Sequence, residues 1–244
     1  MMKTYSLQDK VALVTGASRG IGKAIALALA AEGVSVAAVA RSEQSLCSVR
    51  QAIESSGGKI VTIAADLELP ESPKQIVEQA MTHYGRLDML INNAGIVLSR
   101  PLVETSTEDW DRVMNVNARA PFLLCKEAIP HLKAAGGGTI IQISSVVGVK
   151  GYVDQGAYGA SKHALMGMSK VLAQEVQADN IRVHTILPGG VATDMIAGVR
   201  PDLSPESLMQ PEEIADLVLF LLTRRGNAVI DSIHLRRASS APWF

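Results

Sequence analysis

The chain has 244 residues, a formal net charge of −1 and a hydrophobic fraction of 48%. This length suffices for one large α/β domain, and the near-neutral charge argues against nucleic acid or an anionic membrane as the main partner. No apolar stretch reaches the about 18 residues of a membrane span, and the N-terminus lacks a signal-peptide core, so we expect a cytoplasmic protein. Cys47 and Cys125 lie in no metal-ligand spacing, and we expect both to be buried and no metal to be bound.

Short β-branched stretches alternate with long Ala- and Leu-rich stretches, which is typical of a parallel sheet covered by helices. The pattern predicts seven strands, at 11–15, 34–40, 59–65, 87–93, 138–144, 181–187 and 228–235. It predicts helices at 21–32, 42–55, 72–83, 107–133, 157–177 and 211–222. The expected fold class is α/β, a single-domain Rossmann-like, doubly wound seven-stranded parallel sheet with helices on both faces, spanning residues 1–244.

Residues 188–210 form the longest segment without clear periodicity. A loop of that length in a compact domain is usually a lid or a binding loop. We therefore expect 188–210 to lie over a ligand site.

A glycine-rich turn, "TGASRGIG", joins the first predicted strand to an Ala-rich helix. Gly16, Gly20 and Gly22 would let the backbone approach a ligand closely, and the free N–H groups of the following helix favour a pyrophosphate. The spacing is not the G-x-G-x-x-G of the common dinucleotide fingerprint. The turn therefore indicates a nucleotide site, with helix–strand packing alone as the alternative.

The end of the second predicted strand indicates which dinucleotide would bind. An acidic residue there usually holds the adenosine ribose, whereas an arginine accommodates a 2′-phosphate. The strand ends in "AAVARSEQ", so Arg41 follows it, and Arg19 in the glycine turn adds a second cation. Because Arg can pair bidentately with phosphate, these residues favour NADP(H). The alternatives are that Glu43 serves a ribose, or that Arg41 is only a solvated strand end.

Tyr158 and Lys162 stand four positions apart in "AYGASKHAL" and so share one face of a predicted helix. The ammonium group is expected to lower the pKa of the phenol, which would then exchange a proton with a ketone or alcohol oxygen. Ser144-Ser145, Asn92-Asn93 and Asn117 follow neighbouring strands, and ligands of open parallel sheets bind at those carboxyl ends.

In this order and spacing, "VALVTGASRGIG", "NNAG", "NVN", "ISS", "YGASK", "PGGVATDM" and "PEEIADLVLFLL" resemble the short-chain dehydrogenase/reductase family, of the single-domain Tyr-x-x-x-Lys type. The resemblance covers nearly the whole chain. It implies that Tyr158 is the proton donor or acceptor and that Lys162 lowers its pKa and holds the nicotinamide ribose. It further implies that Ser145, rather than Ser144, orients the substrate oxygen, and that Asn117, rather than Asn115, helps to hold the lysine.

The resemblance also implies a set of cofactor-binding residues. They are Gly16, Ser18, Arg19, Gly20 and Ile21 at the phosphates, Arg41 and Asp66 at the adenosine, Asn93 and Gly95 at its ribose, and Pro188, Gly189 and Thr193 at the nicotinamide. For Asn93 an equal alternative is that it ties neighbouring strands together.

The implied activity is NADP(H)-dependent hydride transfer between the nicotinamide and a carbonyl or secondary alcohol. The overall likeness is to 3-oxoacyl-(acyl carrier protein) reductases, where a basic surface receives the carrier, but Lys133 is the only obvious cation in the corresponding segments. The alternatives are reduction of small ketones or diketones, secondary-alcohol oxidation without a carrier, and non-catalytic nucleotide sensing. The resemblance also implies a homotetramer or homodimer paired through helices 107–133 and 157–177.

The C-terminal segment departs from the family pattern. "VIDSIHLRRASSAPWF" stands where the family often has a Thr-Gly turn and a terminal Asp-Gly-Gly. Two arginines followed by a tail ending in Trp243 and Phe244 suggest a different subunit contact or a different rim of the site.

Overall fold

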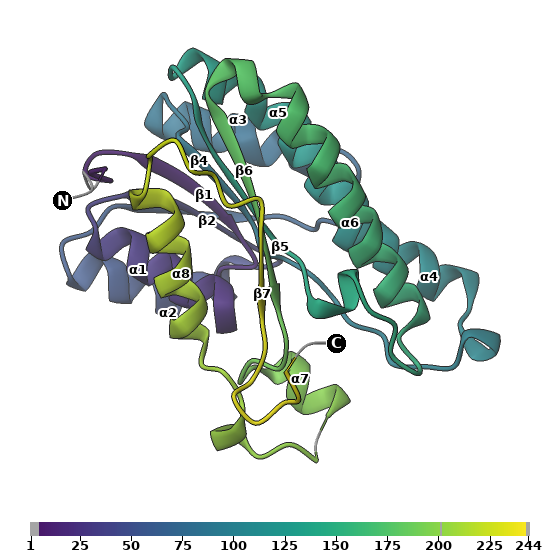
Figure 1. Cartoon of the computed structure of the whole chain (residues 1–244). Coiled ribbons are helices and arrows are strands. Elements are labelled where there is room, and N and C mark those ends of the chain that lie inside the picture. Colours follow the sequence, from purple (N-terminus) through teal and green to yellow (C-terminus); the bar gives the residue numbers. More distant parts are fainter. Residues whose placement is uncertain (1–4, 201, 243–244) are drawn as a thin grey trace.

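Seven parallel strands form one sheet in the computed structural model, which describes residues 5–200 and 202–242. The strand order is β3-β2-β1-β4-β5-β6-β7 (Figure 1). The strands are β1 (Val11–Thr15), β2 (Ser35–Ala40), β3 (Ile60–Ala64), β4 (Met89–Asn92), β5 (Gly138–Ile143), β6 (Ile181–Pro188) and β7 (Ser232–Leu235). The order runs outward in both directions from β1 and β4, which confirms the predicted doubly wound sheet.

Helices cover both faces of this sheet. One face carries α1 (Gly20–Ala31), α2 (Glu43–Ser55) and α8 (Pro211–Thr223). The other carries α3 (Ser72–Tyr84), α5 (Ala120–Ala134) and α6 (Gly156–Glu175), with α4 (Thr107–Met114) beside α6. The short helix α7 (Asp194–Val199) lies beyond the carboxyl ends of the strands, at the bottom of Figure 1.

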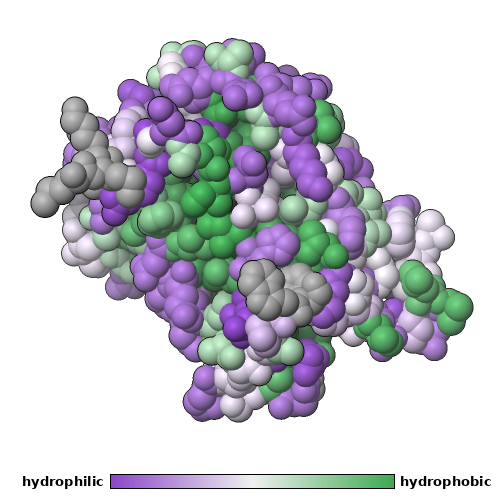
Figure 2. Space-filling view, viewed as in Figure 1, coloured by the Kyte–Doolittle hydropathy of each residue, from purple (hydrophilic) through white to green (hydrophobic). Residues whose placement is uncertain are grey.

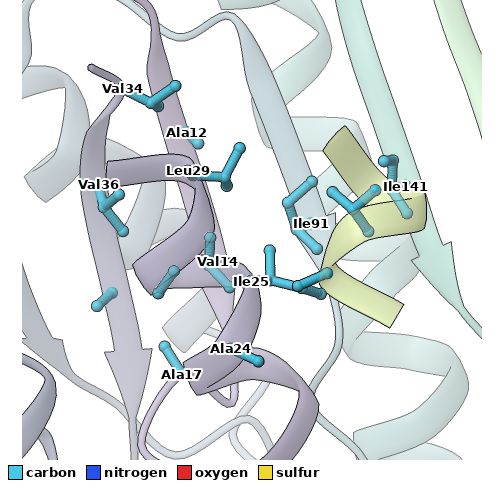
Figure 3. Close-up of a cluster of buried hydrophobic side chains, with 14 of the residues drawn as sticks. Ala12, Val14, Ala17, Ala24, Ile25, Leu29, Val34, Val36, Ile91 and Ile141 are labelled. Carbon is cyan, nitrogen blue, oxygen red and sulfur yellow. The ribbon is translucent and has the colours of Figure 1, made fainter. Parts of the chain in front are cut away.

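The period-two alternation of strand side chains divides the core into two layers. Ala12 and Val14 of β1 face α1, whereas Val11 and Leu13 face the opposite helices. Figure 3 shows the first layer, in which side chains of α1 point toward β1 and β4. Strands buried on both faces read as continuous apolar runs, which is why the sequence pattern located them.

The edge strands are less buried than the strands between them. Along β2 every residue is buried, whereas only Ile63 is fully buried in the edge strand β3, and Ser232 and His234 of the edge strand β7 are exposed. Figure 2 shows apolar side chains gathered on the surface around α8 and β7, where Phe220 and Ile230 are 44% and 37% exposed. No helix within the described residues is long and apolar enough to span a membrane.

Several elements differ from the sequence-based prediction. The predicted helix 107–133 is interrupted by a π-helical segment, Asn115–Arg119, because the side chain of Asn117 is drawn toward the loop after β4. The predicted strand 228–235 is paired only from Ser232, which lies opposite Thr185 of β6. The segment 188–210 contains α7, a helix that the missing periodicity did not predict.

Two further expectations concern single residues. Cys125 is buried as expected, but Cys47 is exposed on α2, so that part of the prediction is wrong. The apolar character of cysteine does not determine which face of a helix it occupies. In α2 the buried face consists of Leu46, Val49 and Ile53, and Cys47 lies outside it. Trp243 and Phe244 lie outside the described residues.

Candidate active site

One cavity of about 1460 Å³ opens at the carboxyl ends of the strands. It brings together all the predicted cofactor-binding residues, from the glycine turn at one end to Pro188, Gly189 and Thr193 at the other. Ser145, Tyr158 and Lys162 line the same space. Asn117 does not line it and is fully buried behind it.

The glycine turn leaves no room for side chains. Gly16 and Gly20 have φ angles of +65° and +53°, which L side chains rarely adopt. A Cβ on Gly16 would come within 2.9 Å of the Ala94 Cα, and one on Gly22 would overlap the Gly16 carbonyl oxygen. The backbone itself therefore forms this wall of the cavity.

Helix α1 begins at this turn without a side-chain cap and with no acidic residue in its first turn. Its first N–H groups and the positive end of its dipole are therefore available to an anion. The glycine turn and the uncapped start of α1 together fit the pyrophosphate of a dinucleotide.

Three cations line the adenosine end of the cavity: Arg19, Arg41 and Lys23. Lys23 was not predicted, although its position one turn after Gly20 in α1 could have indicated it. Glu43, the carboxylate considered for a ribose, does not line the cavity, and it accepts hydrogen bonds from Arg50 of α2 and Thr62 of β3. The three cations could hold a 2′-phosphate, and the carboxylates Asp66 and Glu68 line the cavity as well. Two further cavity-lining residues that sequence reasoning missed are Ser42 and Ser45, which form the start of α2.

Arg19 also contacts the segment that follows β6. Its guanidinium lies 2.6 Å from the carboxylate of Asp194 in α7, and both side chains are largely exposed. A Cβ on Gly20 would reach within 2.9 Å of the Thr193 methyl group. The first part of the predicted lid therefore rests on the glycine turn.

Asn93 joins two strand ends. Its backbone N–H donates to the Thr15 hydroxyl at 3.0 Å, and its side-chain amide donates to the carbonyl groups of Thr15 and Gly16 at 2.9 and 3.3 Å. These bonds hold β4 against the glycine turn. They give Asn93 the strand-tying role that was one of its two predicted roles, and the residue still borders the cavity.

Tyr158, Lys162 and Ser145 form the other end of the site. The Lys162 Nζ donates to the Ile143 carbonyl at 2.9 Å and lies 5.8 Å from the centre of the Tyr158 ring. The Ser145 Oγ lies 3.5 Å from the Pro188 carbonyl oxygen. Each of these three residues exposes less than a tenth of its surface to solvent.

Burial shifts the pKa of both titratable groups at this end of the site, and the shift of Tyr158 differs from the predicted one. Burial raises the pKa of Tyr158, and the Ser145 hydroxyl offsets this only in part. Burial also lowers the pKa of Lys162 from 10.5 to about 8. The pKa of Tyr158 is therefore shifted upward, opposite to the expected lowering by Lys162, because desolvation is the largest cause of the shift. A raised pKa keeps the phenol protonated near neutral pH.

Asn117, which is buried and does not line the cavity, holds the loop after β4 in position. Its amide oxygen accepts the Ile96 N–H at 2.9 Å, and its amide nitrogen donates to the Ile96 carbonyl at 2.8 Å and to the Ser161 hydroxyl at 3.0 Å. Ser161 stands between Tyr158 and Lys162 in α6. π-Helical turns often mark functional positions, and here the turn places one amide between the loop and the Tyr-Lys helix.

Fold and site together define a doubly wound α/β protein whose cavity has a glycine-rich turn at one end and a tyrosine, a lysine and a serine at the other. Residues 10–204 match the family model described as short chain dehydrogenase, and the chain belongs to that family.

Named relatives act on different substrates. The chain is 36% identical to the 3-oxoacyl-[acyl-carrier-protein] reductase FabG of Thermotoga maritima, over 93% of this chain and 96% of that protein. It is 38% identical to the cyclohexanol dehydrogenase of an Acinetobacter species, over 92% of each. A metagenomic short-chain oxidoreductase solved in complex with NADP is 34% identical and has a TM-score of 0.84, over 96% of this chain and 100% of that one.

Proposed function

We propose that the protein is an NADP(H)-dependent oxidoreductase that interconverts a carbonyl group and a secondary alcohol. The observation that supports this best is that Tyr158, Lys162 and Ser145 share one cavity with the glycine turn and the cations Arg19 and Arg41. The nicotinamide cofactor, when bound, would supply or accept the hydride.

The side chains of this chain have distinct parts in that reaction. Ser145 orients the substrate oxygen, and Tyr158, protonated near neutral pH because its pKa is raised, gives that oxygen a proton during reduction. Lys162 is anchored to the Ile143 carbonyl, which fixes its Nζ beside the phenol, where it would also hold the nicotinamide ribose of a bound cofactor. Asn117 holds the loop and helix in place around them.

Removing the phenol hydroxyl tests the assignment. Tyr158→Phe should lower kcat for carbonyl reduction by about 10²- to 10⁴-fold and leave the NADPH dissociation constant within about twofold. Tyr84→Phe is a matched control, because its hydroxyl donates to the Val36 carbonyl at 3.1 Å, outside the cavity. A Tyr158→Phe protein with most of its rate would refute the proposal.

Cofactor preference follows from the adenosine end of the cavity. We expect NADPH to bind at least about tenfold more tightly than NADH, because charge-assisted hydrogen bonds contribute about 1.5–3 kcal/mol. Arg41→Ala should remove most of this preference by weakening NADPH binding alone. Equal dissociation constants for the two cofactors in the unmodified protein would contradict it.

The substrate is proposed as a 3-oxoacyl thioester or, as the second candidate, a small ketone or diketone without a carrier. The first is supported by the relatives named 3-oxoacyl-[acyl-carrier-protein] reductase. The second is supported by Lys133, whose Nζ is paired with Asp179 at 2.7 Å and is thereby less able to attract an acidic carrier. Rates of NADPH oxidation with both substrate classes, and competition by free carrier protein, separate them. Tight NADPH binding with no Tyr158-dependent rate would instead favour a nucleotide sensor.

We also propose that the protein is a homo-oligomer paired through α5 and α6. Phe122 of α5 and Val171 of α6 are 49% and 54% exposed, and the apolar surface around α8 and β7 offers a second face that a tetramer would cover. Light scattering tests this, and a monomer at micromolar concentration would refute it.

A further inference from the structure

Two arginines that directly follow strand β7 line the cavity that also contains Ser145 and Tyr158. Leu235 lies opposite Pro188 in the sheet, and its carbonyl accepts the Gly189 N–H at 2.9 Å. Neighbouring strands lie about 4.8 Å apart, so the chain leaves the sheet beside the carbonyl that Ser145 contacts. Arg236 and Arg237 follow at once, and both line the cavity with Tyr158.

The Arg236 side chain stabilises the segment that follows it, residues 237–240, which is called the tail below. Its guanidinium donates to the carbonyl groups of Arg237, Ala238 and Ser240, at 3.2, 3.3 and 2.8 Å. The Ser240 N–H closes the same turn by donating to the Arg237 carbonyl at 2.9 Å. Arg236 therefore fixes the backbone from which the next side chain extends.

Arg237 lies over a glycine that leaves space for it. A Cβ on Gly190 would be 3.2 Å from the Arg237 Cδ, 3.5 Å from its Nε and 2.9 Å from the Leu208 side chain. The Arg237 side chain is partly buried. Gly190 thus allows a long cationic side chain to lie flat on the cavity wall.

Two other charged residues that line this part of the cavity, Arg200 and Asp194, already have partners. The Nε and Nη2 of Arg200 donate to the two carboxylate oxygens of Asp202, at 2.7 and 2.6 Å, and Asp194 is paired with Arg19. Arg237 donates no hydrogen bond to any described residue; it acts on Asp202 only through space, adding to the stronger effect of Arg200 in lowering the Asp202 pKa. A partly buried guanidinium with its donors unused suits an anion brought by a ligand.

We propose that Arg237 binds an anionic group, a carboxylate or a phosphate ester, on the substrate whose carbonyl lies at Tyr158 and Ser145. This rests on the proposed oxidoreductase function and names the substrate class within it. The body of such a substrate would lie against the apolar part of the cavity, which includes Val97, Val146, Val147 and Val153.

Paired substrates that differ by one anionic group test the proposal. One arm compares 4-oxopentanoate and 5-oxohexanoate with their methyl esters, and the other compares 3-oxobutanoyl phosphopantetheine with 3-oxobutanoyl pantetheine. Arg237→Gln should lower kcat/KM about 10- to 100-fold for the charged member of one pair and change its neutral partner by less than about twofold. Loss confined to the acids identifies a carboxylate, and loss confined to phosphopantetheine identifies a phosphate ester.

A binding measurement separates this inference from the proposed function. The dissociation constants of the same compounds are measured by calorimetry on the NADPH complexes of Tyr158→Phe and Tyr158→Phe/Arg237→Gln, which need no turnover. Lys74→Gln is the matched control, since it removes one cation from α3, outside the cavity. Persistent turnover by Tyr158→Phe would refute the proposed function and leave the binding result intact.

Three results would overturn the role of Arg237. One is that the unmodified protein prefers neither charged compound over its neutral partner. Another is that Arg237→Gln weakens charged and neutral compounds equally, which would show a purely structural effect. The third is that the NADPH dissociation constant rises by the same factor as that of the charged compound, because Arg237 would then bind the cofactor.

Discussion

The two walls of the cavity are built in different ways. The wall at the glycine turn is backbone resting on fully buried strands, and an added methyl group at Gly16 or Gly22 would collide with other main-chain atoms. The wall at α7 and the tail rests on β7, a half-exposed edge strand, and is completed by long side chains such as Arg200 and Arg237. The first wall is thus fixed by steric exclusion, whereas the second can be altered one side chain at a time.

Alanine substitutions at one glycine of each wall should show the largest contrast. Gly22→Ala places a Cβ on the Gly16 carbonyl oxygen, so we expect the free energy of unfolding to fall by about 3 kcal/mol or more, with weakened NADPH binding. A Cβ on Gly198 of α7 meets nothing within 4 Å, and Gly198→Ala should change stability by less than about 1 kcal/mol. Urea unfolding measures both, and similar losses would disprove the contrast.

A second test uses the buried amine of Lys162, at the Tyr158 end of the cavity. The pKa of Lys162 is about 8 in the folded protein and 10.5 in the unfolded chain, so between these values the unfolded chain binds more protons. The free energy of unfolding should therefore rise with pH from 8 to 10.5, by about 3 kcal/mol from this group. Lys162→Met should lack that rise. Parallel pH curves for the two cofactor-free proteins would show that Lys162 stays charged.

The tail should yield a smaller effect. Arg236→Met removes three hydrogen bonds to exposed carbonyl groups, so global stability should fall by no more than about 1 kcal/mol. The loss should be local, with faster hydrogen exchange at the Ser240 amide and unchanged exchange in β1. If the Ser240 amide exchanged at its original rate, Arg236 would not hold the turn.

The smallest effect is expected where the two walls meet. Arg19 and Asp194 form an ion pair whose side chains are 70% and 72% exposed, so Asp194→Asn should change stability by less than about 0.5 kcal/mol. Releasing Arg19 should tighten NADPH binding by about twofold at low salt, and added salt should reduce that gain by screening. Unchanged or weaker binding would show that the pair does not compete with the cofactor.

Local patterns predicted the glycine turn and the Tyr158–Lys162 pair well. The turn 15–22 and the Tyr158–Lys162 pair depend on neighbours within one strand-turn-helix or one helical turn, and the cavity brings both to the same edge of the sheet. The interruption at Asn117 was not predictable, because its hydrogen-bond partner Ile96 is 21 residues away in the sequence. The same holds for the Tyr158 pKa, which depends on burial by several elements rather than on spacing alone.

The hydrogen bonds between Asn117 and Ile96 also affect which residues of the cavity wall can change in sequence. A side-chain amide offers the same donor and acceptor as a peptide group, so Asn117 acts toward Ile96 as one residue of an additional strand would. Because it engages only main-chain atoms of the loop after β4, it holds that loop whatever side chains the loop carries. Val97 and Ser99, which line the cavity, can therefore be exchanged for other residues without releasing the loop. One anchoring amide leaves the substrate-facing sequence open to change.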